Sequence, residues 1–216
     1  MKHKYQLILF DLDGTVADTD EMIVQTMNIL YDKYRGGNRT PREEVYYFSG
    51  PPIVETLNKE FPGCDFDFMF SEFVKYSSEN YPKYVTLYPH TKETLLKLKE
   101  NGYKLGIITN KMHNPTLLCL KLLDLEGIFD TLVCFDDIKH PKPDGESIYK
   151  AMKELNVSDF TKVLYIGDNK IDLDTANNAG IDGVLVTWGP RKLDSSLKPT
   201  FFISSYEELE RRLLDE

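Results

Sequence analysis

The sequence predicts an α/β protein with a doubly wound, mostly parallel, Rossmann-like sheet and an inserted α-helical cap domain. Short runs of apolar residues recur along the chain, and uninterrupted runs suit parallel strands that are covered on both faces. From Thr91 onward these runs alternate with helical patterns. Helical patterns and many aromatic side chains separate the first run from the second, which indicates a separate small core. The predicted α/β core is therefore residues 1–15 and 88–216, and the predicted cap is residues 16–87.

The individual elements follow from the apolar runs and from helix start signals. The first run, Leu7–Phe10, stops at Asp11 and has the length of a buried strand. Later runs occupy residues 105–108, 131–135, 163–166 and 184–186, and residues 201–203 are one more candidate. The helices between these runs are predicted to start near Thr91, Asn114, Ile148, Asp172 and Ser205. Three of these starts carry N-cap side chains, and Asn114 is followed by proline at the first helical position.

Composition narrows the class of partner. The chain has 26 Lys and Arg against 35 Asp and Glu, a formal net charge of −9. Nucleic acid is therefore not expected as a partner, because phosphate backbones need a basic surface. No apolar run approaches the roughly 20 residues of a membrane span, and the N-terminus lacks a signal-peptide pattern. We expect a cytoplasmic protein without a membrane partner, either a monomer or a homodimer.

Two carboxylates follow the first predicted strand, in the stretch Asp11–Thr15. Asp11 lies at the carboxyl end of that strand, where open α/β sheets place their ligands. Asp11 and Asp13 repel each other unless a cation lies close by, and a hard ion such as Mg²⁺ prefers oxygen ligands. An acidic solvated turn is the simpler alternative. The position between an apolar strand and Gly-Thr favours a site.

A second acidic motif, Gly167–Asp172, follows the predicted strand at residues 163–166. Asp168 ends that strand. Asp172 opens a helix, where a carboxylate is also stabilised by the helix dipole alone. Asp174 lies two positions further along the same helix, must point elsewhere, and is expected in solvent.

A hydroxyl and a lysine complete the set. Thr109 ends the predicted strand at residues 105–108 and offers one hydroxyl donor. Lys142 stands between two prolines that stiffen its backbone, although a solvated surface loop is the simpler interpretation. His140 is interpreted as a loop histidine. Strand ends of one parallel sheet meet at one edge, so the hydroxyl, the lysine and four carboxylates are predicted to share one cleft.

The order of these motifs resembles the haloacid dehalogenase superfamily of phosphohydrolases. The shared pattern is D-x-D-G-T, a strand-end Thr, K-P, and then G-D-x-x-x-D. The stretches 11–18, 109–111, 167–169 and 187–189 are similar to the phosphoglycolate phosphatase group and to related bacterial pyrophosphatases. Residues 48–52 resemble a cap loop that faces the active site in that group. The chain departs from the common K-P-x-P pattern because Gly145 follows Asp144.

The resemblance implies roles for the acidic residues. Asp11 is the expected nucleophile and a Mg²⁺ ligand. Asp13 is the expected general acid and base, and its backbone carbonyl is a further metal ligand. Asp168 is expected to bind the same ion, with Asp172 supporting either the metal or Lys142.

The resemblance also implies a phosphate site and a cap that selects the substrate. Thr109, Asn110 and Lys142 are expected to bind the phosphoryl group. Gly50, Pro51 and Arg42 are the candidates for substrate specificity in the cap. Cations for a substrate carboxylate are sought among Arg35, Arg39, Arg42 and Lys59.

The implied activity is Mg²⁺-dependent hydrolysis of a small phosphate monoester through an aspartyl-phosphate, with 2-phosphoglycolate as the first choice. Inorganic pyrophosphate is the alternative substrate. A sugar phosphomutase is less favoured, because members of that branch commonly lack the Thr that stands here as Thr15. A dehalogenase would have no use for Asp13 or for Mg²⁺. Outside these enzymes, a receiver-type phosphorylatable switch would not be expected to carry the helical insert, and an idle binding protein would be expected to have lost Asp11 or Asp13.

Overall fold

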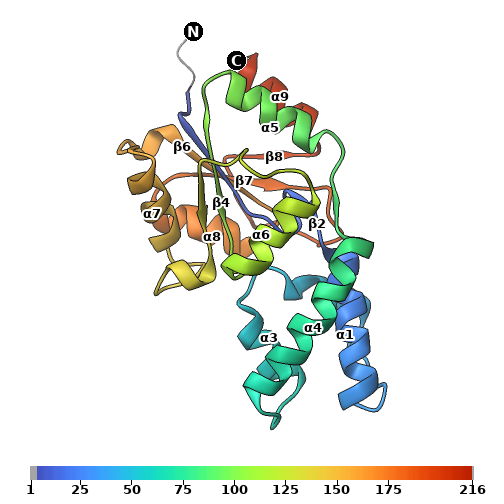
Figure 1. Ribbon diagram of the computed structural model, residues 1–216. Coiled ribbons are helices and arrows are strands. Elements are labelled where there is room, and N and C mark those ends of the chain that lie inside the picture. The colour runs from blue at the N-terminus through green and yellow to red at the C-terminus, as the bar shows by residue number, and fades with distance from the viewer. Residues whose placement is uncertain (1–3, 216) are drawn as a thin grey trace.

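The core is one parallel sheet, seen in a computed structural model that describes residues 4–215 (Figure 1). Its six strands lie in the order β5-β4-β1-β6-β7-β8, and every neighbouring pair is parallel. The strands are β1 Leu7–Phe10, β4 Lys104–Ile108, β5 Thr131–Val133, β6 Val163–Gly167, β7 Asp182–Val186 and β8 Phe201–Ile203. Every apolar run contains a strand, although Cys134 and Phe135 lie beyond the end of β5, and the doubly wound α/β class is confirmed.

Helices cover both faces of this sheet, which explains why its strands are uninterruptedly apolar. In β1, Leu7 and Leu9 pack into one cluster with side chains of α7 and α8. Ile8 and Phe10 point to the opposite face and share a cluster with α5, α6 and α9. The bounds are α5 Thr91–Glu100, α6 His113–Leu122, α7 Glu146–Glu154, α8 Lys170–Ala179 and α9 Tyr206–Leu214. Short 3₁₀ turns lie at η2 Phe135–Asp137 and η3 Phe160–Lys162.

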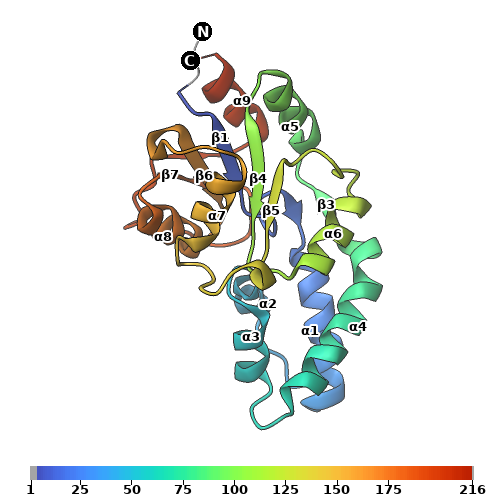
Figure 2. The ribbon, with the colours of Figure 1, turned by 60° about the vertical axis from the view of Figure 1, so that its left-hand side comes forward.

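A group of helices lies at the end of the sheet opposite the two termini (Figures 1 and 2). They are α1 Asp20–Tyr34, α2 Arg42–Val45, α3 Ile53–Glu60 and α4 Phe66–Tyr84, with the 3₁₀ turn η1 Tyr46–Phe48 after α2. Figure 2 shows α1 and α4 side by side. Among residues 4–215, no helix combines the length and the apolar character that crossing a membrane requires.

A small ribbon that the sequence did not predict stands between the cap helices and the core. Strands β2 Ala17–Asp18 and β3 Thr86–Leu87 pair antiparallel. Strands of two residues are too short to show a hydrophobic period, so the sequence pattern could not predict them. We propose that this ribbon is the connection between the two domains and that the cap proper spans residues 20–84. Residues 1–3 and 216 of the expected core lie outside the described residues.

Two expected helix starts lie earlier in the chain than predicted, one by a single residue and the other by two. Thr91 was expected as an N-cap, but His90 holds that position with φ 62°. Asn114 was expected to cap α6, but the helix already begins at His113, because a carboxylate of η2 accepts the His113 N–H at 2.8 Å. The start near Ser205 is confirmed, since its hydroxyl caps α9.

The sheet core makes a direct stability prediction. Leu9 is fully buried at the centre of β1, whereas Leu96 on α5 is 43% exposed. Leu9→Ala should lower the free energy of unfolding by about 3 kcal/mol, because it removes buried methyl groups and leaves a cavity. Leu96→Ala, the matched control, should change it by less than about 0.5 kcal/mol. Urea unfolding measures both, and equal losses would contradict this description of the core.

Candidate active site

Three predicted site residues lie at the carboxyl ends of neighbouring strands. Asp11 follows β1, Thr109 follows β4, and Asp168 follows β6. β1 pairs with β4 on one side and with β6 on the other. The chain runs from β1 outward through β4 and β5, and then returns to β6 on the opposite side. The three residues therefore lie where the strand order reverses, which is the usual ligand crevice of such sheets.

Lys142 lies buried between two of the acidic residues. Its Nζ is 2.7 Å from Asp11 Oδ1 and 2.7 Å from Asp172 Oδ1, and it donates to the Tyr165 hydroxyl at 3.2 Å. The three donors of the ammonium are thus all used. Burial lowers the pKa of Lys142, but the two carboxylates more than offset it, so the pKa lies above its usual value. This lysine stays charged.

Asn110 positions Lys142 through the backbone. Its Oδ1 accepts the Lys142 N–H at 3.0 Å, and its Nδ2 donates to the Lys142 carbonyl at 3.4 Å. The same Nδ2 donates to the Gly50 carbonyl of the cap at 2.8 Å. The Asn110 side chain, expected at the phosphate, is therefore engaged with the lysine loop and with the cap loop.

Asp11, Asp168 and Asp172 form a buried group whose oxygens lie within 4.8 Å of one another. Asp11 Oδ2 and Asp168 Oδ2 are both buried and accept no hydrogen bond. Burial raises the pKa of Asp11 to about 7, against the opposing pull of Lys142, and burial also raises the pKa of Asp168. Asp168 Oδ2 faces one guanidinium nitrogen of Arg191 at 2.7 Å, whereas Asp11 Oδ2 faces no donor among the described residues, and a buried anionic oxygen of that kind is costly unless a cation meets it. Oxygen ligands of this kind fit a hard divalent cation, so the group could hold a metal ion.

Asp172 serves the site and the helix at once. α8 begins at Lys170, two residues before the expected start, and Asp172 Oδ2 accepts the Asn169 N–H at 3.1 Å. The other oxygen, Oδ1, receives the hydrogen bond from Lys142. Gly167 allows this close approach, because a Cβ there would lie 2.2 Å from the Asp172 Cβ. Asp172 therefore caps the helix and contacts Lys142, and its part in a metal site stays a prediction.

Asp174 and His140 have surface partners. Asp174 forms an ion pair with Lys170 and is half-buried, so it is not simply in solvent. His140 is exposed in its loop, and its Nδ1 lies 2.8 Å from Glu146.

Asp13 is buried and pairs with a lysine to which sequence reasoning gave no role. Lys111 Nζ lies 2.5 Å from Asp13 Oδ1 and 5.3 Å from the centroid of the Tyr81 ring. Asp13 raises the pKa of Lys111 although burial opposes it. The available signal was position, since Lys111 lies two residues after Thr109 at the same strand end. A solvated lysine is nevertheless the ordinary expectation there.

Arg191, between β7 and β8, is the second residue that sequence reasoning missed. Its Nη2 lies 2.5 Å from Asp20 Oδ1, and its Nη1 lies 2.7 Å from Asp168 Oδ2 without hydrogen-bond alignment. Asp20 is the first residue of α1. Arg191 thus connects the acidic group with the start of the cap. Nothing in the local sequence indicates this contact, because Asp20 lies 171 positions away.

A cavity of about 230 Å³ opens beside Asp11 and Asp13, between the core and the cap. Its core wall includes Thr109, Asn110 and Lys111. Its cap wall includes Gly50 and Pro51, two of the three specificity candidates. Within the part of the chain that the structure describes, none of the proposed cations Arg35, Arg39, Arg42 and Lys59 lines it. Arg42 instead pairs with Glu21 on the cap surface.

Comparison with known proteins assigns the chain to a family. The family model of the haloacid dehalogenase-like hydrolases matches residues 8–186. The chain therefore belongs to this family, and it is a phosphatase of the haloacid dehalogenase type. Family membership disfavours the receiver-type switch that the sequence had left open.

Individual relatives cover nearly the whole chain. A pyrophosphatase PpaX from Bacillus velezensis is 38% identical over 94% of this chain and 93% of its own length. A pyrophosphatase PpaX from Oceanobacillus iheyensis is 32% identical over 92% of this chain and 88% of its own. A haloacid dehalogenase-like hydrolase structure from Bacteroides fragilis superposes with a TM-score of 0.85 at 27% identity, covering 95% of this chain and 100% of that one. A structure of a "predicted phosphoglycolate phosphatase" from Haemophilus somnus has a TM-score of 0.85 at 23% identity, covering 97% and 98%, and supports the fold alone.

Two glycines with the same backbone angle test the site geometry. Gly14 and Gly102 both have φ +85°, but only at Gly14 would a Cβ clash, 2.2 Å from Asp168 Oδ2. Gly14→Ala and Gly102→Ala should each cost about 1 kcal/mol of left-handed strain. Gly14→Ala should in addition lower phosphatase kcat/KM about a hundredfold by displacing Asp168. Phosphate release and urea unfolding separate the two effects. Equal activity of the two variants would contradict the described packing.

The Arg191 contacts predict a large stability effect. Arg191→Met leaves Asp20 and Asp168 buried without their cation and should cost about 3–5 kcal/mol in the metal-free protein. Arg39→Met breaks an exposed pair with Asp32 and should cost less than about 1 kcal/mol. Urea unfolding in EDTA measures both. A loss at Arg191 no larger than that at Arg39 would show that the buried pairs are not formed.

Proposed function

We propose that this phosphatase acts through a covalent aspartyl-phosphate on Asp11 and depends on Mg²⁺. The observation that carries the proposal is the free, buried Oδ2 of Asp11 at the strand end. The other oxygen of this carboxylate is held by Lys142, so the side chain is oriented while one oxygen remains available for attack.

The reaction proceeds in two steps. Asp11 Oδ2 bonds to phosphorus as the bond to the leaving oxygen breaks, and Asp13 gives its proton to that oxygen. Asp13 then removes a proton from water, whose oxygen attacks phosphorus. The bond between phosphorus and Asp11 breaks, which releases inorganic phosphate and regenerates both side chains. Asp11 and Asp13 lie two residues apart directly after β1, and both line the same cavity.

Positive charge must offset the repulsion between the carboxylate and the phosphate. Asp11, Asp168 and the Asp13 carbonyl would hold Mg²⁺, with Asp172 beside them. Bound there, the ion supplies electrostatic stabilisation of the transferring phosphoryl group. The Thr109 hydroxyl would bind a phosphoryl oxygen. Lys142, whose three donors are engaged by Asp11, Asp172 and Tyr165, would offset negative charge from beside Asp11, and Asn110 fixes the lysine loop.

Among small phosphorylated substrates, we propose inorganic pyrophosphate as the first to test. Relatives that are named pyrophosphatases support it, at 32–38% identity over nearly the whole chain. 2-Phosphoglycolate, the choice made from the motifs, stands second, because the structure named for it supports the fold alone.

The experiment is phosphate release from both substrates, in Mg²⁺ and in EDTA, by wild type, Asp11→Asn and the control Asp174→Asn. Wild type and Asp174→Asn should release phosphate in Mg²⁺ only. Asp11→Asn should lose about a thousandfold or more in kcat, as expected for loss of a nucleophile. Undiminished activity in Asp11→Asn would contradict the covalent route. A folded wild type that releases phosphate from neither these substrates nor other phosphate monoesters would contradict the proposed function.

A further inference from the structure

We propose that the cavity accepts phosphate monoesters whose leaving group carries a small hydrocarbon body, an aliphatic chain or a single ring. This inference rests on the proposed phosphatase mechanism, is independent of the choice between pyrophosphate and 2-phosphoglycolate, and names a further substrate class for the same site. It arises from the wall of apolar residues that lines the cavity together with the catalytic carboxylates.

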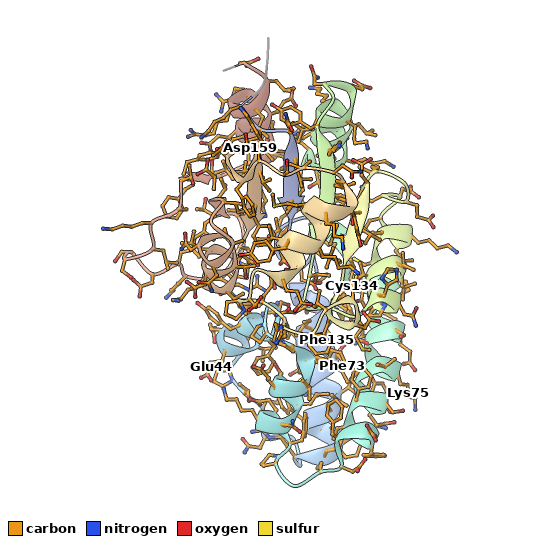
Figure 3. The ribbon with its side chains drawn as sticks, turned by 90° about the vertical axis from the view of Figure 1, so that its left-hand side faces the viewer. Glu44, Phe73, Lys75, Cys134, Phe135 and Asp159 are labelled. Carbon is orange, nitrogen blue, oxygen red and sulfur yellow. The ribbon has the colours of Figure 1, made fainter. Side chains whose placement is uncertain are left out.

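That wall is apolar over most of its extent. It is formed by α1, α3 and α4 of the cap and by α6 of the core, with Ile23, Ile53, Phe70, Phe73, Val74 and Leu118 among its residues. Figure 3 shows Phe73 on the cap side and Phe135 on the core side of the boundary between the cap and the core. Val74 is 43% exposed. These side chains are not all covered by the protein itself, so a ligand that covers them is stabilised by the hydrophobic effect.

The charges of the cavity also favour an uncharged leaving group. Among the described residues that line it, Lys111 is the one cation, and it already pairs with Asp13. A leaving group with a second anion, such as phosphate or glycolate, would have to compete with Asp13 for that lysine. A hydrocarbon body makes no such demand on Lys111.

The size of the cavity sets the size of the leaving group. Its volume is about 230 Å³. A cavity of about 150 Å³ is enough to hold benzene. The leaving phosphate of pyrophosphate has no hydrocarbon surface to place against Phe73 and Val74. A ring or a chain of a few carbons would cover this wall.

The experiment compares kcat/KM in Mg²⁺ for methyl, propyl and butyl phosphate, with pyrophosphate and 2-phosphoglycolate beside them. These alkyl leaving groups have similar basicity, so a trend reports contact with the wall. We expect kcat/KM to rise about fourfold for each added methylene that is buried. A flat or falling series, with the anionic substrates still hydrolysed, overturns this inference alone. Release from none of the five overturns the proposed function as well.

A matched pair of variants locates the contact. Val74→Ser changes a wall residue, and Leu117→Ser changes a residue on α6 that is 45% exposed and absent from the described lining. Val74→Ser should lower the butyl-to-methyl ratio of kcat/KM at least about threefold, since it removes apolar contact area. Leu117→Ser should leave the ratio unchanged. The ratio is internal to each protein, so a loss of folded enzyme cannot produce the effect. An unchanged ratio in Val74→Ser overturns the assignment of this wall to the leaving group.

Discussion

Unbalanced negative charge at the strand ends is the constraint on which the rest of the site depends. Five buried carboxylates face three cations there, which leaves 3 − 5 = −2 when all are ionised. The carboxylates are Asp11, Asp13, Asp20, Asp168 and Asp172, and the cations are Lys111, Lys142 and Arg191. Charge of this kind is costly to bury without a partner. A divalent cation held by Asp11 and Asp168 would restore the balance.

The fold makes this concentration of charge possible by bringing distant segments to one edge of the sheet. The segments after β1 and β6 and the first turns of α1 and α8 supply the carboxylates, and the loop after η2 supplies Lys142. The same contacts reach the cap. Asn110 joins the lysine loop to Gly50, and Arg191 joins Asp168 to the first residue of α1. The position of the cap, and hence the shape of the cavity, is therefore tied to the groups that perform the chemistry.

Most of the core site could be predicted because its residues follow apolar runs directly. Asp11, Thr109 and Asp168 each end a strand, and parallel strand ends meet by necessity. Arg191 could not be predicted, because it lies in the connection between β7 and β8 and meets Asp20 and Asp168 only in the folded protein. The apolar wall of the cavity could not be predicted from the sequence either. Aromatic residues at helical spacing indicated a cap core, and only the tertiary packing shows which of them, such as Phe73, face the cleft.

The binding of Mg²⁺ tests the charge argument most directly, and isothermal titration calorimetry with thermal unfolding measures it without relying on turnover. One Mg²⁺ should bind per chain, and the Tm should rise with Mg²⁺ concentration, because the ion binds the folded state alone. Asp168→Asn should lose both effects, whereas Asp174→Asn, on the same helix-and-strand unit but outside the acidic group, should keep them. Absence of Mg²⁺ binding in the folded wild type, or equal binding in Asp168→Asn, would contradict the account.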